Sequence, residues 1–396
     1  MTTRYFGMDV HKDYVVVAAV DATSGEIIEP VRVDMPKLKE WIDKHLTSDD
    51  AVALEVSSNA WHVYDLLAHQ AGQVVVSNPA KTRLIAQARI KTDKFDALAL
   101  ARLLASGFIC DIWVPVSKVR EQRALVAHRQ GLSKHSTQVK NRLHALLRRH
   151  DLRCPVSSVF SPEGRAWFES LDLSPVETLE RQQLLAQLDL VQAQLAKVNT
   201  FIARRTQHDP RITRLMQIPG IGFFTAFSVL AAIGDINRFP SPKHLSSYAG
   251  LVPSVHQSGQ KNFTGHITKA GRPLLRWLMV EAAHFAVRWD PHWQAVYQNI
   301  AKRRGKSVAL VAVARKLLVV IWHLLAREAP YLYLNPSSFT RKLTEWAWAI
   351  GRENLLAENA RAFVAHQLQV TDLALAVEGR GCLSLLFLGE RNLSQI

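Results

Sequence analysis

Cysteine is scarce in this sequence: the chain holds three, Cys110, Cys154 and Cys382, among 396 residues. An odd and widely scattered set forms neither a disulfide framework nor the paired spacing of a zinc site. The scarcity therefore argues against a small secreted, disulfide-bonded scaffold. It favours the reducing environment of the cytoplasm.

The sequence also lacks an apolar run suited to a lipid bilayer. The most apolar late stretch, residues 308–325, carries Arg315 and Lys316 near its middle, and two cations there would be costly in hydrocarbon. The start, Met1 to Val10, lacks the charged-then-apolar layout of a signal peptide. We expect a core helix over 308–325 and no membrane partner.

Acidic residues are few relative to basic ones. The chain has 34 Asp and Glu against 49 Lys and Arg, a net charge of +15. Such an excess predicts a polyanionic partner, foremost nucleic acid, although a basic protein without one is the alternative. Hydrophobic residues make up 48% of the chain, enough for real cores, and its length predicts two or three domains.

Short apolar, β-branched runs dominate the first part of the chain. Strands are expected at 4–10, 14–20, 26–33, 51–56 and 74–76, and helices at 36–46, 59–70 and 93–105. Three neighbouring strands followed by alternating helix and strand predict an α/β layer domain over residues 1–115.

A basic segment follows at residues 116–155, with ten Lys or Arg against two acids and apolar residues at helical spacing. We expect a long basic helix. Like charges at this density repel one another, which favours nucleic-acid contact over a merely solvated face. The candidate contacts are Lys140, Arg142, Arg148 and Arg149.

A helical middle region, residues 116–205, is expected to continue as a coiled coil. Ser174-Pro175-Val176-Glu177 is a capping box, and the apolar seam that follows it alternates four- and three-residue steps from Leu184 to Ile202. This seam could pair with the basic helix of the same chain or between chains. Residues 206–330 predict a mostly α-helical domain, and residues 331–396 carry no recognisable motif.

Four acids stand at positions that could converge. Asp9 and Glu55 end two apolar strands, and Asp93 and Asp96 lie three residues apart at a helix start. Asp93 alone is explained equally well by the helix dipole. Together the four could meet at one sheet edge and bind Mg²⁺ or Mn²⁺, metals that can clamp a phosphate during displacement.

The segment from Leu215 to Ala226 contains Pro219-Gly220-Ile221-Gly222 between two short helical patterns. It predicts a helix-hairpin-helix, in which Gly220 and Gly222 let backbone amides approach a phosphate of DNA without reading its sequence. A plain helical hairpin is the alternative.

Ser258 lies in a polar, glycine-flanked loop with cations on both sides in sequence. Such cations could hold a phosphodiester while a hydroxyl attacks it; the candidates are Lys261, Lys269, Arg272 and Arg276. On spacing alone Ser246 and Ser254 are equal candidates, and an ordinary turn serine explains Ser258 as well.

In this order, the motifs resemble the insertion-sequence transposases that use a noncoding bridge RNA and the related Piv-type site-specific DNA invertases. The resemblance covers roughly residues 4–325. Its N-terminal part is similar to a RuvC-like, RNase H-type domain, and its C-terminal part to the family's serine transposase domain. The motifs that carry it are Gly7 to Lys12, Asn78-Pro79, residues 91–97, residues 218–222, Ala249 to Leu251, the spacing from Pro253 to Gly259, and residues 268–271.

The resemblance implies that Asp9, Glu55, Asp93 and Asp96 form a DEDD metal site and that Ser258 is the nucleophile. It implies a guide RNA, for which residues 116–155 are the expected seat. It also implies a homodimer or homotetramer in which two domains compose each active site, acting in the bacterial cytoplasm and at the nucleoid.

We therefore expect an α/β RNase H-like (RuvC-like) N-terminal domain, a helical coiled-coil middle, and a mostly α C-terminal domain with a helix-hairpin-helix. The expected activity is DNA recombination that excises and inserts a mobile element, with donor and target DNA as partners. A metal-dependent nuclease or junction resolvase and a non-catalytic nucleic-acid scaffold are the alternatives.

Overall fold

The computed structural model describes residues 2–85, 92–258, 261–328, 331–355 and 359–370. The chain divides into two compact units, Met1–Val116 and Ser117–Ile396. Cys382 and the end of the sequence segment 331–396 lie outside the described residues.

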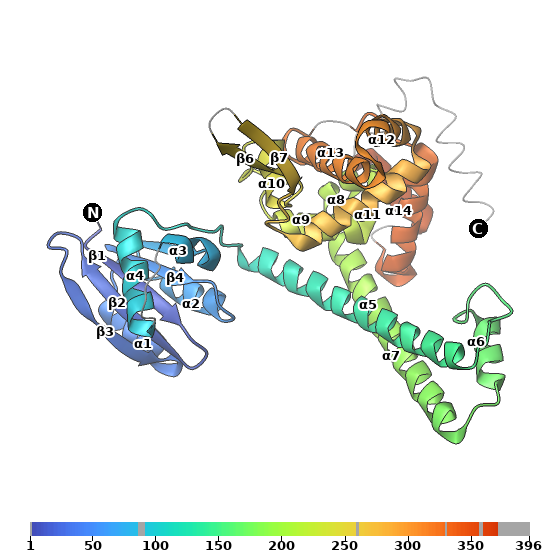
Figure 1. Ribbon diagram of the computed structural model, residues 1–396, viewed down its shortest axis with the longest axis horizontal. Coiled ribbons are helices and arrows are strands. Elements are labelled where there is room, and N and C mark those ends of the chain that lie inside the picture. Colours follow the sequence, from blue (N-terminus) through green and yellow to red (C-terminus); the bar gives the residue numbers. More distant parts are fainter. Residues whose placement is uncertain (1, 86–91, 259–260, 329–330, 356–358, 371–396) are drawn as a thin grey trace. The chain divides into compact units, whose positions relative to one another are not determined.

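Unit 1 is built on a five-stranded mixed sheet with the strand order β3-β2-β1-β4-β5 (Figure 1). Its strands are β1 (Arg4–Val10), β2 (Tyr14–Asp21), β3 (Ile27–Asp34), β4 (Asp50–Glu55) and β5 (Gln73–Ser77). The first three strands pair antiparallel, whereas β4 runs parallel to β1 and to β5. The expected α/β architecture is confirmed, and the mixed sheet fits an RNase H-like domain.

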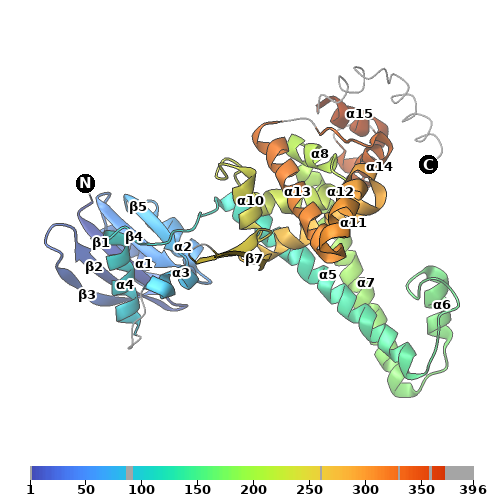
Figure 2. The same cartoon turned by 45° about the horizontal axis from the view of Figure 1, so that its top comes forward.

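Helices cover both faces of this sheet. The helices are η1 (Met35–Lys37), α1 (Leu38–His45), α2 (Ala60–Leu67), α3 (Pro79–Ile85) and α4 (Asp93–Ala105). Because side chains alternate along a strand, Phe6 and Met8 of β1 pack into the cluster that contains α1 and α2. The odd-numbered positions of β1 face α4, which lies directly over β1 and β2 (Figure 2).

Unit 2 begins with two long helices joined through a short one. α5 (Ser117–Arg149) and α7 (Pro175–Thr206) lie side by side in opposite directions, with α6 (Pro162–Ser170) between them in sequence (Figures 1 and 2). Ser174 caps α7 by accepting a hydrogen bond from the Glu177 backbone amide. Leu184 and Leu188 of the apolar seam are buried against α5, so in this structure the seam packs within the chain.

The rest of unit 2 is a helical domain around one large hydrophobic core. Its elements are α8 (Pro210–Met216), α9 (Phe223–Ile233), α10 (Pro242–Tyr248), β6 (Pro253–Ser258), β7 (Lys261–Ile267), α11 (Pro273–Trp289), α12 (Pro291–Arg304), α13 (Lys306–Ala326), α14 (Pro336–Ile350), η2 (Arg352–Asn354) and α15 (Ala360–Val370). β6 and β7 form an antiparallel hairpin.

α13 is long and apolar enough, by length and composition alone, to cross a membrane. In the structure it packs against α10, α11 and α12. Val313, Leu317 and Ile321 are fully buried in the core, which agrees with the core helix expected over 308–325.

α14 and α15 carry sequence to which no motif was assigned, yet they pack into the same core. Phe339, Trp346 and Phe363 are buried there. The indole nitrogen of Trp346 donates a hydrogen bond of 3.2 Å to the backbone oxygen of Ala203 at the end of α7. This part of the chain therefore supports the helices around it.

Candidate functional site

Asp9 and Glu55 reach the same edge and face of the sheet. In the parallel pair β1–β4, Met8 lies opposite Leu54, so Asp9 and Glu55 follow one residue later on neighbouring strands. Ala53, two residues before Glu55, packs against the α4 side of the sheet. Strand alternation therefore directs both carboxylates toward α4.

The start of α4 brings the other two acids. Thr92 is its N-cap and accepts a hydrogen bond of 3.4 Å from the Phe95 amide, and Asp93 and Asp96 occupy the first turn. Acids are favoured at a helix N-terminus, which explains why this helix can begin here. Lys91, which belongs to the same sequence motif, lies outside the described residues.

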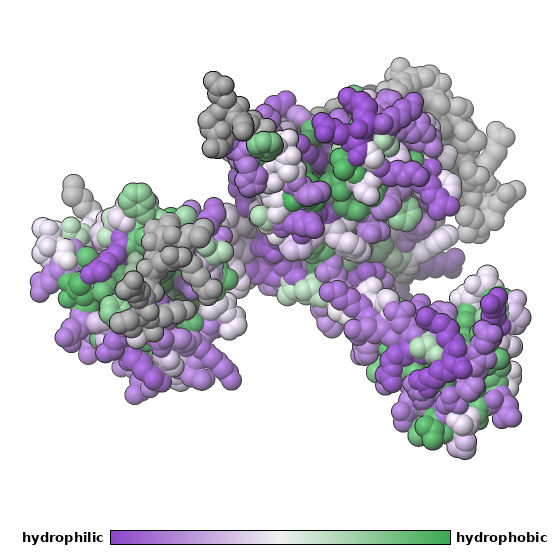
Figure 3. Space-filling view, in the orientation of Figure 1, coloured by the Kyte–Doolittle hydropathy of each residue, from purple (hydrophilic) through white to green (hydrophobic). Residues whose placement is uncertain are grey.

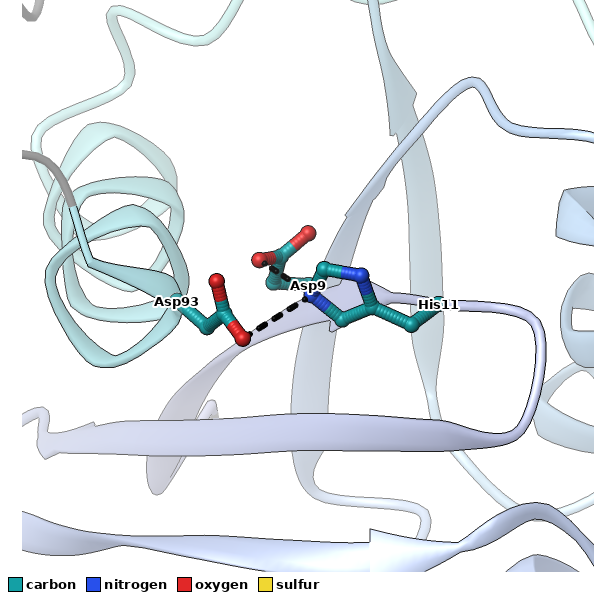
Figure 4. A group of neighbouring side chains, drawn as sticks. All are labelled: Asp9, His11 and Asp93. Carbon is teal, nitrogen blue, oxygen red and sulfur yellow. Dashed lines mark hydrogen bonds and ion pairs between the residues drawn. The ribbon is translucent and has the colours of Figure 1, made fainter.

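Three side chains meet at this edge of the sheet: Asp9, His11 and Asp93 (Figure 4). The Nε2 atom of His11 lies 3.1 Å from Oδ2 of Asp9 and 3.2 Å from Oδ2 of Asp93. The hydroxyl of Tyr14 donates a hydrogen bond of 3.0 Å to Oδ2 of Asp93, and its ring stacks on His11. These contacts orient the Asp93 carboxylate toward Asp9.

The surroundings of Asp9 disfavour the ionised form of its carboxylate. Burial raises the pKa of Asp9, and the negative charges of Asp93 and Asp96 raise it further, while His11 opposes them. A divalent cation would relieve both effects, since it stabilises ionised carboxylates at close range.

The donor set fits a divalent metal. One ligand atom from each of Asp9, His11 and Asp93 lies within 4.8 Å of the other two. Glu55 and Asp96 lie outside this trio of mutually close ligand atoms. His11 was absent from the sequence-based site. It follows the last residue of β1, and its spacing from Asp9 signals it, because residues two apart in an extended chain lie on the same side.

Gly7 lets α4 come close enough to form this site. A Cβ atom at residue 7 would lie 1.9 Å from the backbone oxygen of Ala97 and 2.5 Å from the backbone nitrogen of Ala101. Both are atoms of α4, one to two turns after Asp93. Only glycine fits at this contact between strand and helix.

We predict that Gly7→Ala displaces α4 and separates Asp93 from Asp9. The overpacking should cost at least about 2 kcal/mol of unfolding free energy and lower DNA cleavage more than it lowers the folded fraction. Thermal unfolding and a cleavage assay on the same preparation test this. Gly131→Ala, at an open position on α5 where alanine needs no unusual backbone conformation, is the matched control. A variant with wild-type cleavage and stability would contradict the close approach.

The second candidate centre lies on the β6–β7 hairpin of unit 2. Ser258 is the last residue of β6 and pairs with Lys261, the first of β7. The side chains of both residues, and Gly259 with Gln260 between them, lie outside the described residues. Ser246, an equal candidate by spacing, is fully buried in α10 and donates its hydroxyl hydrogen to the Pro242 backbone oxygen.

The loops at the base of this hairpin interlock. A Cβ atom on Gly250 would lie 2.5 Å from the Ala270 oxygen, and one on Gly271 would lie 2.2 Å from the Tyr248 oxygen. Arg276 donates hydrogen bonds of 3.1 Å to the backbone oxygens of Ala249 and Lys269. Arg276, one of the expected phosphate clamps, therefore holds the two loops together. Gly250 and Gly271 are needed because a side chain at either position would clash with the neighbouring backbone.

Three arginines surround Tyr248, the last residue of α10. Arg272 donates a hydrogen bond of 2.9 Å to the Tyr248 hydroxyl, and the Arg238 guanidinium lies 4.3 Å from the centre of its ring. Burial opposes ionisation of Tyr248, but the charges of Arg272, Arg238 and Arg123 outweigh it and lower its pKa. Of these arginines the sequence singled out Arg272 alone. Such a cluster can hold a phosphate group.

The turn between α8 and α9 combines a tight packing contact with an open position. Gly220 has φ +77°, and a Cβ atom there would lie 2.7 Å from the Ala282 oxygen of α11. Gly222, the N-cap of α9, has open space where its Cβ would be. Gly220 therefore holds the turn against α11, whereas Gly222 leaves room for a ligand at the helix start.

The basic face of α5 is partly neutralised by α7. Arg149 forms an ion pair of 3.0 Å with Glu180, and Arg142 approaches the same carboxylate at 3.9 Å. Lys140 lies over the ring of Phe160. Arg148 is exposed, and hydrophilic residues cover much of the visible face of the long helices (Figure 3).

Comparisons with known proteins agree with this arrangement. A family model described as the transposase IS116/IS110/IS902 family matches residues 212–298, which include the β6–β7 hairpin. A second transposase model, for the DEDD domain of the IS110 transposases, matches residues 6–151, which include Asp9, Glu55, Asp93 and Asp96.

Two relatives that align over most of their length support the same family assignment. The pilin gene-inverting protein of Moraxella bovis is 30% identical over 308 residues, covering 74% of this chain and 86% of that protein. The transposase for insertion sequence element IS1111A of Coxiella burnetii is 25% identical over 348 residues, covering 83% of this chain and 91% of that protein. The chain therefore belongs to the IS116/IS110/IS902 family of transposases and is a recombinase that cleaves and rejoins DNA.

Proposed function

We propose that this transposase excises and inserts its own element through a covalent link between Ser258 and DNA. The proposal rests on one observation above all: an acidic cluster at the edge of an RNase H-like sheet occurs in the same chain as a glycine-flanked serine hairpin. The burial of Ser246 removes one competing serine, which adds support for Ser258.

In the proposed step, the Ser258 hydroxyl attacks the scissile phosphorus. A bond forms between its oxygen and phosphorus, and the bond from phosphorus to the deoxyribose oxygen breaks. The serine proton leaves to a base, and the departing deoxyribose oxygen gains a proton. The phosphodiester energy is kept in the serine ester, so rejoining to a second DNA end needs no ATP.

The carboxylates would hold Mg²⁺, with Asp9, Glu55, Asp93 and Asp96 as the proposed ligands. When bound, such an ion stabilises negative charge on phosphate oxygens. Tyr14 and His11 orient Asp93 through the contacts described above. Arg272, beside Tyr248, is a candidate phosphate clamp, together with Lys261 and Lys269.

The nature of the cleaved DNA end tests this function. Purified protein, its copurified RNA and an end-labelled donor duplex are mixed with Mg²⁺ and denatured, and the products are separated on a gel. The recombinase proposal expects a labelled band that shifts after protease treatment. Free cleaved ends without attached protein would instead support a metal-dependent nuclease, and an unchanged duplex would support a non-catalytic scaffold.

We further propose that α8 and α9 form a helix-hairpin-helix that grips DNA without reading its sequence. The open position of Gly222 at the N-terminus of α9 supports this, because amides at a helix start bind phosphate. The expected contribution is to affinity for any duplex.

A noncoding guide RNA is the partner proposed for α5. Because Arg149 and Arg142 are paired with Glu180, we expect the exposed Arg148 and the partly exposed Lys140 to contribute more. Lys140→Glu with Arg148→Glu should weaken RNA binding at least about tenfold and flatten its salt dependence. Filter binding at several salt concentrations measures this, with Lys39→Glu on α1 as control. Unchanged RNA affinity would exclude α5 as the RNA-binding site.

A further inference from the structure

The turn between α8 and α9 encloses a positive charge that comes from far along the chain. The Nζ atom of Lys342, on α14, donates hydrogen bonds of 2.9 Å and 3.1 Å to the backbone oxygens of Ile218 and Ile221. It donates a third to the backbone oxygen of Met216. One ammonium group thus binds three carbonyl oxygens of a single short turn.

Three carbonyl oxygens directed at one point repel each other unless a cation lies between them. Rings of carbonyl oxygens are how proteins replace the hydration shell of K⁺. A lysine ammonium has three N–H donors, and here each has a carbonyl acceptor. The side chain of Lys342 therefore satisfies the turn in the way that a monovalent metal ion would.

Burial makes the charged form of Lys342 unfavourable unless the turn compensates it. Burial, together with the charge of Arg341, lowers the pKa of Lys342 to about 7, whereas Glu345 opposes this. The three carbonyl dipoles favour the charged form. Among the ion pairs of the described residues, none includes Lys342, so the backbone oxygens of the turn, and not a carboxylate, compensate its charge.

We propose that the backbone oxygens of Met216, Ile218 and Ile221 form a monovalent-cation site whose occupant is the ammonium group of Lys342. α14 thereby fixes the shape of the α8–α9 turn and makes it independent of dissolved K⁺. Where the inference concerns DNA, it rests on the proposed role of α8 and α9 as a DNA grip.

The surroundings of the turn make the proposal testable. A cavity lies against it, lined by Gly220, Gly222, Trp289 and Lys342 itself. Trp289 is largely exposed, so the cavity opens to solvent. Small ions can therefore reach the carbonyl oxygens once the lysine side chain is shortened.

The test compares Lys342→Ala with Lys342→Met in different chlorides. Thermal unfolding is recorded in potassium, ammonium and choline chloride at equal ionic strength. Lys342→Ala should unfold at least about 5 °C below the wild type in choline and recover half or more of that loss in potassium or ammonium. Lys342→Met should lose as much and recover nothing, because its side chain fills the path to the carbonyls. The wild type and Arg341→Ala should respond equally to all three salts.

Equal unfolding temperatures of Lys342→Ala in all three chlorides would overturn the inference, as would a selective response of the wild type. If Lys342→Ala does not purify folded, the folded fraction recovered after refolding from urea in each chloride gives the same comparison. Duplex affinity of Lys342→Ala is measured in parallel. Potassium-restored stability with wild-type DNA affinity in every salt would keep the cation site and reject the DNA role of the turn.

Discussion

Replacing Ser258 by alanine should eliminate the covalent protein–DNA product while leaving DNA binding intact. Alanine retains the Cβ atom but has no hydroxyl to attack phosphorus, so adduct formation should fall at least about a thousandfold. The residue ends β6, where it pairs with Lys261 at the start of β7, and the substitution replaces only the hydroxyl group by a hydrogen atom. The measurement is the labelled, protease-sensitive band described above, together with duplex affinity at fixed salt.

Ser254→Ala is the matched control for this prediction. Ser254 lies on the same strand, and its hydroxyl is close to Gly265 on β7. It should form adduct at a rate within a few-fold of the wild type. Adduct that persists in Ser258→Ala and disappears in Ser254→Ala would transfer the nucleophile to Ser254. Cleavage without adduct in the wild type would reject serine chemistry altogether.

Asp9→Asn should lower DNA cleavage without lowering the stability of the protein in metal-free buffer. Without its carboxylate, the cluster loses a proposed Mg²⁺ ligand, and DNA cleavage should fall by about 10²–10⁴-fold. In metal-free buffer the variant should be as stable as the wild type or more stable. Burial and the charges of Asp93 and Asp96 make an ionised Asp9 unfavourable without a cation.

Addition of Mg²⁺ then distinguishes the two proteins. A ligand that binds the folded state alone raises the unfolding temperature with its concentration. The wild type should show this rise, and Asp9→Asn should show a much smaller one. Asp43→Asn, on the exposed surface of α1 where Asp43 pairs with Lys39, should behave like the wild type. Equal Mg²⁺ stabilisation of Asp9→Asn and the wild type would remove Asp9 from the metal site.

Chelation of the metal should reproduce the effect of Asp9→Asn in the wild type. EDTA should suppress cleavage and adduct formation together if the carboxylates assist the serine, and excess Mg²⁺ should restore both. Adduct formation that continues in EDTA would show that the serine acts without the carboxylate site.

Most of the sheet could be predicted from the sequence because its signals are local. The first two strands are short apolar runs with β-branched residues, and burial of such runs depends little on what covers them. Asp9 and Glu55 stood out for the same reason, as acids at the ends of buried strands. The capping box at Ser174 and the seam from Leu184 likewise depend on neighbours within one or two helical turns.

The tertiary structure decided how these local pieces meet. His11 and Tyr14 joined the acidic cluster because a tight turn and an antiparallel strand return them beside Asp93. The sequence could not show that Gly7 touches α4, since the contact spans some ninety positions and depends on helix placement.

Unit 2 shows the same limit over a longer range. Composition and motif spacing were enough to indicate a basic, cysteine-poor protein with acidic residues at strand ends, a glycine-rich turn and a polar loop that contains a serine. Three further facts depend on packing between distant segments. Ser246 is buried, Arg276 holds two loops together, and Lys342 lies against the carbonyl groups of Ile218 and Ile221. Residue type and spacing fix which groups can bind, but packing between distant segments decides which partner each group finds.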